Sequence, residues 1–521
     1  MFGSSLTVAI YLLLLTAFSA WFRTRSASGS FWMDEGLSVG IASHPLGDIP
    51  GLLKQDGSPP LYYMALGAWM GAVGRTEANT HLFSMLASLA CIPVAFFGMR
   101  TMFSRRTGVI AASLFASSAF LSSYSQETRM YSLVALLSLM TAVCFLLAFV
   151  ARRRIWLVGF ALSQAAMLYT HGWGIFFGIG VAVAYLYLVI AEPNGRRGLL
   201  VDGLIGFGAV AVMFLPWLPT LIYQSQHTAA PWALSPDLGV PIQIGFLLGG
   251  QRIAFLLLVA AALGVQRVLA GNSVGVPENA SLKGSLNSVA TKRALVVLLL
   301  MFLGTIAVGW TVSQFNPAWV LRYLAAVLGP LLLAFSVGAA RSGAVGIAAV
   351  AIAVMSSFSP SINRDVNVKS NVRNIATEVN PVLKKGALVI VAQPEQTPLV
   401  WYYLRGGMRF ADPMGATSDP RMLNRVDVVD RLRAADPKTT WNKLADTVPV
   451  GGQVLLVRPL TVGISNWSAP WTFLVRRRSA QWSELLQSDP RFVREVTAPS
   501  FYIPAVTVAD SAVLYRRVSG R

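Results

Sequence analysis

The chain has 521 residues, of which 55% are hydrophobic and only 12% are charged. Soluble domains carry about 25% charged residues, so this composition excludes a typical soluble protein and indicates one that crosses a membrane several times. The formal net charge is +19, but many basic residues stand in short clusters between apolar segments, which favours cytoplasmic loops over nucleic-acid binding.

The first apolar segment covers residues 6–22 and is soon followed by two adjacent carboxylates, Asp34 and Glu35. The segment is longer than the hydrophobic region of a signal peptide, and no basic residue precedes it, so we expect it to remain as the first span. Cleavage would leave the two carboxylates on the same side of the membrane. Adjacent acids in such a place are often plain loop charges, and the alternative is a reactive centre.

Apolar segments long enough to cross a bilayer, roughly 17–25 residues each, recur as far as residue 358. We expect about eleven spans, near residues 5–22, 82–99, 107–124, 131–150, 155–170, 173–190, 199–216, 250–268, 294–313, 320–339 and 343–358. Alternate connections are basic, as at Arg105 and Arg106 or at residues 152–154, and the positive-inside rule places them in the cytoplasm. An odd number of spans puts the N-terminus inside and the C-terminus outside.

The outer connections hold nearly all of the unusual polar residues that stand next to spans. They are residues 23–80, 125–130, 170–173, 217–249 and 314–320. The residues concerned are Lys54 and Asp56 in the first connection, Glu127, Arg129 and Tyr131 in "SQETRMYS", His171 and Trp173 in "THGWG", and Arg322 and Tyr323 in "LRYL". Singly, each has an ordinary explanation, such as a packed histidine or an arginine that reaches headgroups. Their common face favours a functional interpretation.

The composition changes near residue 359, and residues 359–521 carry ordinary amounts of charge. Short β-rich stretches at 387–393, 452–460 and 511–518 alternate with helical ones, which predicts a small extracytoplasmic α/β domain. We therefore expect a polytopic α-helical membrane domain over residues 1–358, with a large first outer loop at 23–80, followed by this domain. No internal repeat is visible, which weakens a transporter interpretation.

The outer-face residues fit sugar transfer from a polyprenyl phosphate. The leaving phosphate needs cationic partners, which Arg322 and Arg129 would supply. The acceptor hydroxyl needs one carboxylate as general base, and Asp34 is the candidate. A single displacement would invert the anomeric carbon. The sequence has no P-loop and no dinucleotide fingerprint.

The stretches "MDEG", "DGSPPLYY", "SQETRMYSL", "YTHGWG" and "RYL" together resemble motifs of the GT-C glycosyltransferases. The most similar branch contains the protein O-mannosyltransferases and the aminoarabinose transferase of lipid A, and the resemblance covers roughly residues 1–340. It implies a polyprenyl-phosphate-sugar donor and an active site at the outer membrane boundary. By position, Asp34 matches the catalytic base, Glu35 its partner and Arg322 the arginine at the lipid phosphate. Glu127 and Arg129 match the motif of the second outer loop.

The first loop departs from the family pattern. Relatives often carry a basic residue just before the Pro-Pro pair, whereas this chain has Asp56, Gly57 and Ser58. Lys54 would then contact the donor phosphate, or Asp56 would contact the sugar or acceptor. We further expect Glu35, Asp56, Glu127 and His171 to orient the donor or acceptor, Trp173 and Tyr131 to line the cavity, and Tyr323 to contact a substrate.

No metal or other cofactor is required by the sequence, although a divalent cation is compatible with it. Asp34, Glu127 and His171 have suitable ligand atoms, but no spacing signature supports such a site. The two cysteines, Cys91 and Cys144, lie inside apolar segments, which indicates neither a disulfide nor a thiolate site.

We therefore expect an inverting glycosyltransferase of the plasma membrane that moves a sugar, arabinose or mannose favoured, from a polyprenyl-phosphate carrier. The acceptor would be a cell-envelope glycan, glycolipid or protein, and no nucleic acid is expected as a partner. The C-terminal domain is similar to the extra outer domains of actinobacterial cell-wall glycosyltransferases, which implies acceptor binding, and the Ala-, Val-, Gly- and Arg-rich composition fits such a source. The alternatives are a polyprenyl-lipid transporter or flippase, a non-catalytic envelope assembly protein, and a polymerase or ligase that uses a diphosphate-linked glycan. The sequence does not fix the sugar, acceptor, linkage or oligomeric state.

Overall fold

The computed structural model describes residues 5–228, 233–269, 288–357, 369–460, 469–499 and 509–518. The chain forms two compact units. The first contains residues 1–27, 81–219 and 235–363, and the second contains residues 28–80, 220–234 and 364–521. The first outer connection thus belongs to the same compact unit as the C-terminal residues, whereas the sequence assigned it to the membrane domain.

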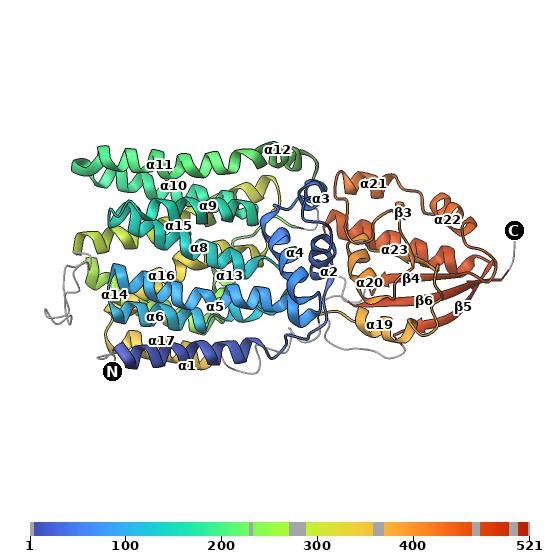
Figure 1. Ribbon diagram of the computed structural model, residues 1–521, viewed down its shortest axis with the longest axis horizontal. Helices are drawn as coiled ribbons and strands as arrows, with labels where there is room; N and C mark the ends of the chain where they lie inside the picture. The colour runs from blue at the N-terminus through green and yellow to red at the C-terminus, as the bar shows by residue number, and fades with distance from the viewer. Residues whose placement is uncertain are drawn as a thin grey trace. The chain divides into compact units, whose positions relative to one another are not determined.

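The first unit is a bundle of helices (Figure 1). Its helices are α1 (Ser5–Arg23), α5 (Glu77–Met102), α6 (Arg105–Ala116), α7 (Ala119–Tyr124), α8 (Tyr131–Phe145), α9 (Trp156–Thr170), α10 (Trp173–Ala191), α11 (Arg196–Phe214), α12 (Leu218–His227), α13 (Val240–Leu247), α14 (Gln251–Leu269), α15 (Ser288–Phe315), α16 (Ala325–Arg341) and α17 (Ala344–Ser357). The first turn of α5 and all of α12 after its first two residues belong to the second unit. A short 3-10 turn, η5 (Leu321–Leu324), leads into α16.

Within the described residues, eight helical stretches are long and apolar enough to cross a membrane, which identifies a multi-pass membrane protein. The other three expected spans coincide with shorter helices: α9, α17, and the pair α6 and α7. Ser118 separates that pair, because its hydroxyl accepts the N–H of Leu121 and caps α7. The expected total of about eleven spans stays a prediction.

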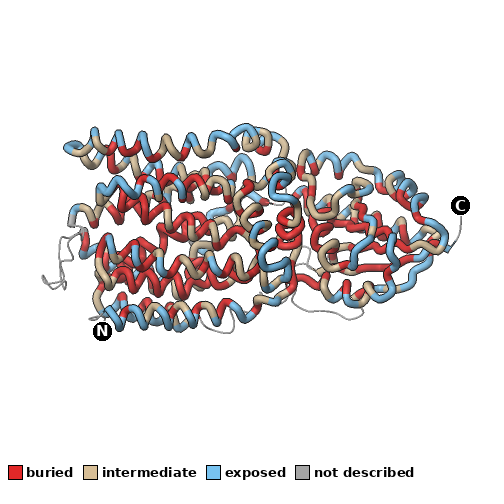
Figure 2. The backbone as a smooth tube through the Cα atoms, in the orientation of Figure 1, coloured by how far each residue is buried: buried red, intermediate tan, exposed pale blue. Residues whose placement is uncertain are grey.

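Small residues let the central helices of the bundle approach closely. A Cβ on Gly329 of α16 would lie 2.5 Å from the backbone nitrogen of Leu139 on α8, and one on Gly338 would lie 2.6 Å from the carbonyl oxygen of Ala261 on α14. The helix α16 is accordingly buried almost throughout, whereas α1 and α11 expose one side (Figure 2). Arg322 lies in η5, directly before this buried helix.

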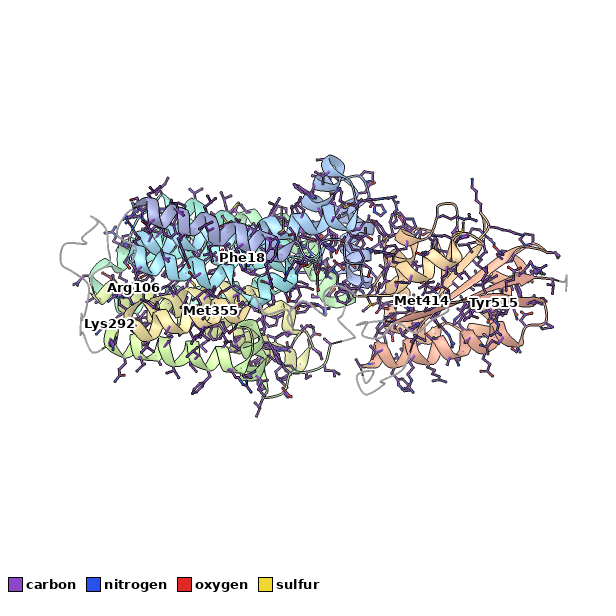
Figure 3. The ribbon with its side chains drawn as sticks, turned by 90° about the horizontal axis from the view of Figure 1, so that it is seen from below. Phe18, Arg106, Lys292, Met355, Met414 and Tyr515 are labelled. Carbon is purple, nitrogen blue, oxygen red and sulfur yellow. The ribbon has the colours of Figure 1, made fainter. Side chains whose placement is uncertain are left out.

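Basic connections gather at one end of the first unit, where Arg106 and Lys292 both lie (Figure 3). Two further arginines of such connections, Arg152 and Arg154, approach the buried carboxylate of Asp202 to 3.4 and 2.7 Å. The alternation of basic and less basic connections that the sequence showed agrees with this arrangement.

The second unit is built around a six-stranded sheet. The strands are β1 (Leu388–Val391), β2 (Arg409–Asp412), β3 (Gly415–Thr417), β4 (Gln453–Pro459), β5 (Phe492–Ala498) and β6 (Asp510–Arg517), in the order β3-β2-β1-β4-β6-β5. Strand β1 is parallel to both β2 and β4, and the other pairs are antiparallel. Strands β1 and β4 read as nearly continuous apolar runs because both of their faces are covered. The expected C-terminal α/β architecture is confirmed.

Helices cover this sheet and extend the unit. They are α2 (Met33–Ala42), α3 (Ile49–Asp56), α4 (Leu61–Val73), α19 (Val372–Val379), α20 (Thr397–Tyr403), α21 (Val428–Ala434), α22 (Pro437–Asp446) and α23 (Pro470–Ser488). Trp441 and Trp482 form the centre of the core between helices and sheet. Gly36 and Gly40 lie one turn apart on α2, and there α2 touches the backbone of Leu399 and Arg421, because a Cβ on either glycine would collide with it.

Candidate active site

Six of the sequence-predicted residues gather in the first unit, where three connections meet. Arg129 precedes α8 and Tyr131 begins it, His171 and Trp173 lie at the junction of α9 and α10, and Arg322 and Tyr323 lie in η5. The ring centres of His171 and Tyr323 are 4.7 Å apart, and that of Tyr131 lies 6.1 Å from the first and 6.3 Å from the second. These residues define the aromatic–arginine cluster.

Two guanidinium groups give this cluster a positive charge. The Cζ atom of Arg129 lies 5.8 Å from the ring centre of Tyr131, and that of Arg322 lies 5.7 Å from the ring centre of Tyr323. Arginine is favoured where a phosphate must be held, because its planar fork donates two parallel hydrogen bonds. The cluster therefore has the chemistry of an anion site lined by aromatic rings.

His171 lies in the connection between α9 and α10 and is neutral at physiological pH. Burial lowers its pKa to about 3, and the positive charges of Arg129 and Arg322 act in the same direction. The backbone N–H of Trp173 donates to Nδ1 of His171 over 3.1 Å, so Nδ1 carries no proton. The single imidazole proton is consequently on Nε2, and the side chain offers one uncharged N–H donor.

Trp173 forms a wall of the cluster. Its indole N–H donates to the carbonyl of Ala318 over 3.0 Å, and its ring packs edge-on against Trp319, with ring centres 5.1 Å apart. The indole of Trp319 in turn donates to Gln243 over 2.6 Å. Trp319 was missed as a site residue, although it stands three positions before Arg322. Glu127 lies half-buried in the connection between α7 and α8.

The paired acids lie in the second unit, in the first turn of α2. Glu35 is fully buried, and the ammonium group of Lys369 lies 2.8 Å from each of its carboxylate oxygens. Glu35 also accepts the backbone N–H of Trp32 over 3.2 Å. Asp34 is half-buried at the same helix N-terminus, where the helix dipole stabilises a negative charge. The structure thus gives the two acids different surroundings.

Lys54 and Asp56 lie at the end of α3, and they differ in burial and in contacts. Asp56 is buried, forms an ion pair of 3.2 Å with Arg425 and accepts the hydroxyl of Ser58 over 2.7 Å. Lys54 is exposed, and its ammonium group lies 4.6 Å from the ring centre of Tyr223. Asp56 therefore holds the turn before the Pro-Pro pair together, and Lys54 keeps a charge that a ligand can approach.

Sequence reasoning missed the partners of the buried acids. Lys369 stands 334 positions after Glu35, and Arg425 is similarly distant from Asp56. No local periodicity or motif links residues so far apart in the chain, so the sequence carried no signal for these ion pairs.

The chemistry around His171 does not fit a divalent cation. Its Nδ1 lone pair accepts a hydrogen bond, its Nε2 bears the proton, and two arginines repel positive charge. Within the described ranges, no three His, Cys, Asp or Glu side chains lie close enough to hold a metal ion.

Part of the chain is similar in sequence to a known protein family. Residues 57–223 match the family model described as dolichyl-phosphate-mannose-protein mannosyltransferase. This segment includes Arg129 and His171, and excludes Asp34 and Arg322. No curated protein sequence matches the chain.

Solved structures match over nearly the whole chain. ArnT from Cupriavidus metallidurans bound to undecaprenyl phosphate is 12% identical with a TM-score of 0.62, and the match covers 98% of each chain. The chain has the GT-C fold. Arabinofuranosyltransferase AftD from Mycobacteria (13% identity, TM-score 0.53, 98% of this chain and 40% of that chain) has a similar structure. Oligosaccharyltransferase AglB from Archaeoglobus fulgidus, in complex with an inhibitory peptide and a dolichol-phosphate, is also similar in structure. It is 11% identical with a TM-score of 0.52, and the match covers 96% of this chain and 74% of that chain. The resemblance to GT-C glycosyltransferases is confirmed at the level of the fold.

Proposed function

We propose that this GT-C protein is an inverting glycosyltransferase that moves a sugar from a polyprenyl-phosphate carrier to a cell-envelope glycan, glycolipid or protein. Arabinose and mannose are the favoured sugars. The reaction takes place at the outer face of the plasma membrane, with the N-terminus in the cytoplasm and the second unit outside.

The aromatic–arginine cluster is the observation that carries this proposal. A sugar phosphate on a lipid carrier brings a phosphodiester anion to the membrane boundary, and Arg129 and Arg322 are the two cations that would bind it. His171 adds a neutral N–H donor, which can bond a phosphate or sugar oxygen without a change of charge. The aromatic rings of Tyr131, Trp173 and Tyr323 lie close together in the same cluster and offer apolar faces against which a sugar ring could pack.

Asp34 is the proposed general base. It removes the proton from the acceptor hydroxyl, and the hydroxyl oxygen forms a new bond to the anomeric carbon of the donor sugar. The bond between that carbon and the phosphate oxygen breaks in the same step. The polyprenyl phosphate leaves as a stable anion, so no general acid is needed. The attack comes from the side opposite the leaving group, which inverts the configuration. Lys54 and Glu127 are proposed to assist in binding the donor phosphate and the sugar.

Glu35 and Asp56 act through their ion pairs. Lys369 holds Glu35 beneath the first turn of α2 and so fixes the turn that bears Asp34. Arg425 holds Asp56 at the end of α3. Both are positioning residues for the first outer connection.

The substitution Asp34→Asn tests the proposal, because it removes the base and keeps the shape. Purified protein would receive radiolabelled polyprenyl-phosphate arabinose or mannose together with an envelope glycan extract. We expect sugar transfer to fall by about 10²–10⁴-fold, the usual contribution of a general base, with donor binding and thermal stability unchanged. Asp48→Asn is the matched control, because Asp48 is an exposed acid of the same connection.

Three outcomes would contradict the proposal. Transfer at the wild-type rate by Asp34→Asn would make Asp34 a loop charge. Donor binding without transfer by the wild-type protein would favour an assembly protein, and movement of the lipid across vesicles would favour a flippase.

A further inference from the structure

Five arginines of the first unit lie together where α9 and α11 begin. They are residues 152–154, just before α9, and residues 196–197, in the first turn of α11, and they define the arginine patch. The two helices pack against each other (Figure 1), and a Cβ on Gly198 would lie 2.6 Å from Nη2 of Arg152. Two connections that are far apart in the sequence therefore form one surface.

A buried carboxylate organises part of the arginine patch. The side chain of Asp202 on α11 is only 1% exposed, and its oxygens lie 3.4 Å from Nη2 of Arg152 and 2.7 Å from Nε of Arg154. Arg152 has a φ of 57°, in the left-handed region that favours glycine after a helix, so an arginine at this position has a cost to the backbone. One carboxylate thus holds two guanidinium groups in place.

The arginine patch keeps a large excess of positive charge. In the part of the chain that the structure describes, Arg153, Arg196 and Arg197 form no ion pair, and all three are exposed. Glu192, the acid that precedes α11, is paired with Arg293. Neither α9 nor α11 has an acidic residue in its first turn, where the helix dipole would favour one. The surface therefore attracts an anion.

Exposed apolar side chains continue from the arginine patch along both helices. They are Leu200, Val201 and Leu204 on α11, and Ile155, Val158 and Leu162 on α9. A spacing of three or four residues places each set on one side of its helix, and on α11 the same spacing leads back to Arg197. An anion that carries apolar chains matches both parts of this surface, whereas a soluble polyanion matches the arginines alone.

The arginine patch is separate from the aromatic–arginine cluster. Helix α9 begins at Trp156, beside the patch, and ends at Thr170, beside His171. Its 15 residues span about 20 Å, so one phosphate group cannot contact both sets of arginines. A polyprenyl phosphate bound at the cluster therefore leaves the patch unoccupied.

We propose that the arginine patch binds the headgroup of an anionic phospholipid, whose acyl chains lie along α9 and α11. Basic pockets between membrane helices bind such headgroups in other membrane proteins. The phospholipid is a bound partner and not a substrate, and the proposal does not depend on sugar transfer. By neutralising the arginines, it reduces their mutual repulsion and stabilises the contact between the two helices.

Removal of one unpaired arginine from each connection tests the inference. The patch variant is Arg153→Gln/Arg197→Gln, which changes two exposed side chains. The charge-matched control is Arg105→Gln/Arg267→Gln, in the first turn of α6 and the last turn of α14. Full-length protein in detergent would be titrated with phosphatidylglycerol, phosphatidylcholine, glycerol 3-phosphate and polyglutamate, and native mass spectrometry would measure binding. Thermal unfolding and polyprenyl phosphate binding would be measured on the same samples.

We expect wild type and control to bind phosphatidylglycerol more tightly than phosphatidylcholine, and the patch variant to bind phosphatidylglycerol at least about tenfold more weakly. Added salt should weaken this binding in the wild type. Phosphatidylglycerol should raise the unfolding temperature of the wild type more than that of the patch variant, and polyprenyl phosphate binding should be equal in all three proteins.

Four results would overturn the inference. Phosphatidylglycerol binding that survives in the patch variant would exclude these arginines as its site, and equal weakening in the control would reduce the effect to overall charge. Glycerol 3-phosphate or polyglutamate that binds as tightly as the lipid would replace the phospholipid with a soluble anion. Loss of polyprenyl phosphate binding in the patch variant would make the patch part of the donor site.

Discussion

At the scale of single residues, the surroundings of each titratable group decide what it can do. Asp34 and Glu35 are neighbours in sequence, yet one is half-buried at a helix N-terminus and the other is enclosed with Lys369. No signal in the sequence indicated this difference in surroundings, because Lys369 stands 334 positions after Glu35. By contrast, Arg129, His171 and Arg322 could be grouped in advance, since alternating connections place them on one face.

The protonation of His171 leads to a prediction about acid stability. Its folded-state pKa, about 3, lies below the unfolded value of about 6.5. For a base shifted downwards, the stabilisation is complete above pH 6.5 and is lost as the pH falls towards 3, by up to about 1.4 kcal/mol per pH unit. We expect His171→Gln to lose less thermal stability than wild type between pH 7 and pH 5. The measurement is the unfolding temperature of both proteins at each pH. If both temperatures fell by the same amount, His171 would be protonated as easily in the folded protein as in a free peptide, and the prediction would be wrong.

At the scale of elements, the hydrophobic pattern predicted most helices of the bundle because each long apolar run must bury its backbone groups in a helix. Over residues 107–124 it predicted one helix where the structure has two, α6 and α7, because Ser118 caps the second. The hydrophobic pattern could not predict how α2 packs, because Gly36 contacts the backbone of Leu399, which is far away in the sequence.

The ion pair of Glu35 and Lys369 anchors α2, and we expect a single variant of this pair to be less stable than the double variant. Lys369→Met leaves a buried carboxylate without its counter-ion and should destabilise the second unit by about 3–5 kcal/mol. Adding Glu35→Gln removes that uncompensated charge and should restore most of the lost stability. Chemical unfolding of the single and double variants measures this. Additive losses would mean that the two side chains act independently.

The folded double variant also separates two roles for Glu35. If Glu35 only positions α2, the double variant should retain sugar transfer to within about tenfold, a change of about 1.4 kcal/mol. Loss comparable to that of Asp34→Asn would make Glu35 part of the chemistry itself.

At the scale of the whole molecule, the proposed orientation can be tested by labelling. Cys91 and Cys144 are both buried, so the native protein should react slowly with maleimides. Asn194→Cys lies on an exposed turn between α10 and α11, in a connection assigned to the cytoplasm, and Ala480→Cys lies on the exposed side of α23. We expect a membrane-impermeant maleimide to label Ala480→Cys in intact cells and Asn194→Cys only after permeabilisation. The reverse result would invert the proposed topology.

The discontinuity of the second unit has a consequence for biogenesis. Its segments, 28–80, 220–234 and 364–521, leave the ribosome far apart in time. Glu35 is synthesised 334 residues before Lys369, which at about 5–20 residues per second is a delay on the order of tens of seconds. During that interval the first segment lacks the later part of the chain against which it packs. The nascent protein therefore passes through membrane insertion with its second unit unassembled, and this unit is complete only after the last part of the chain has been made.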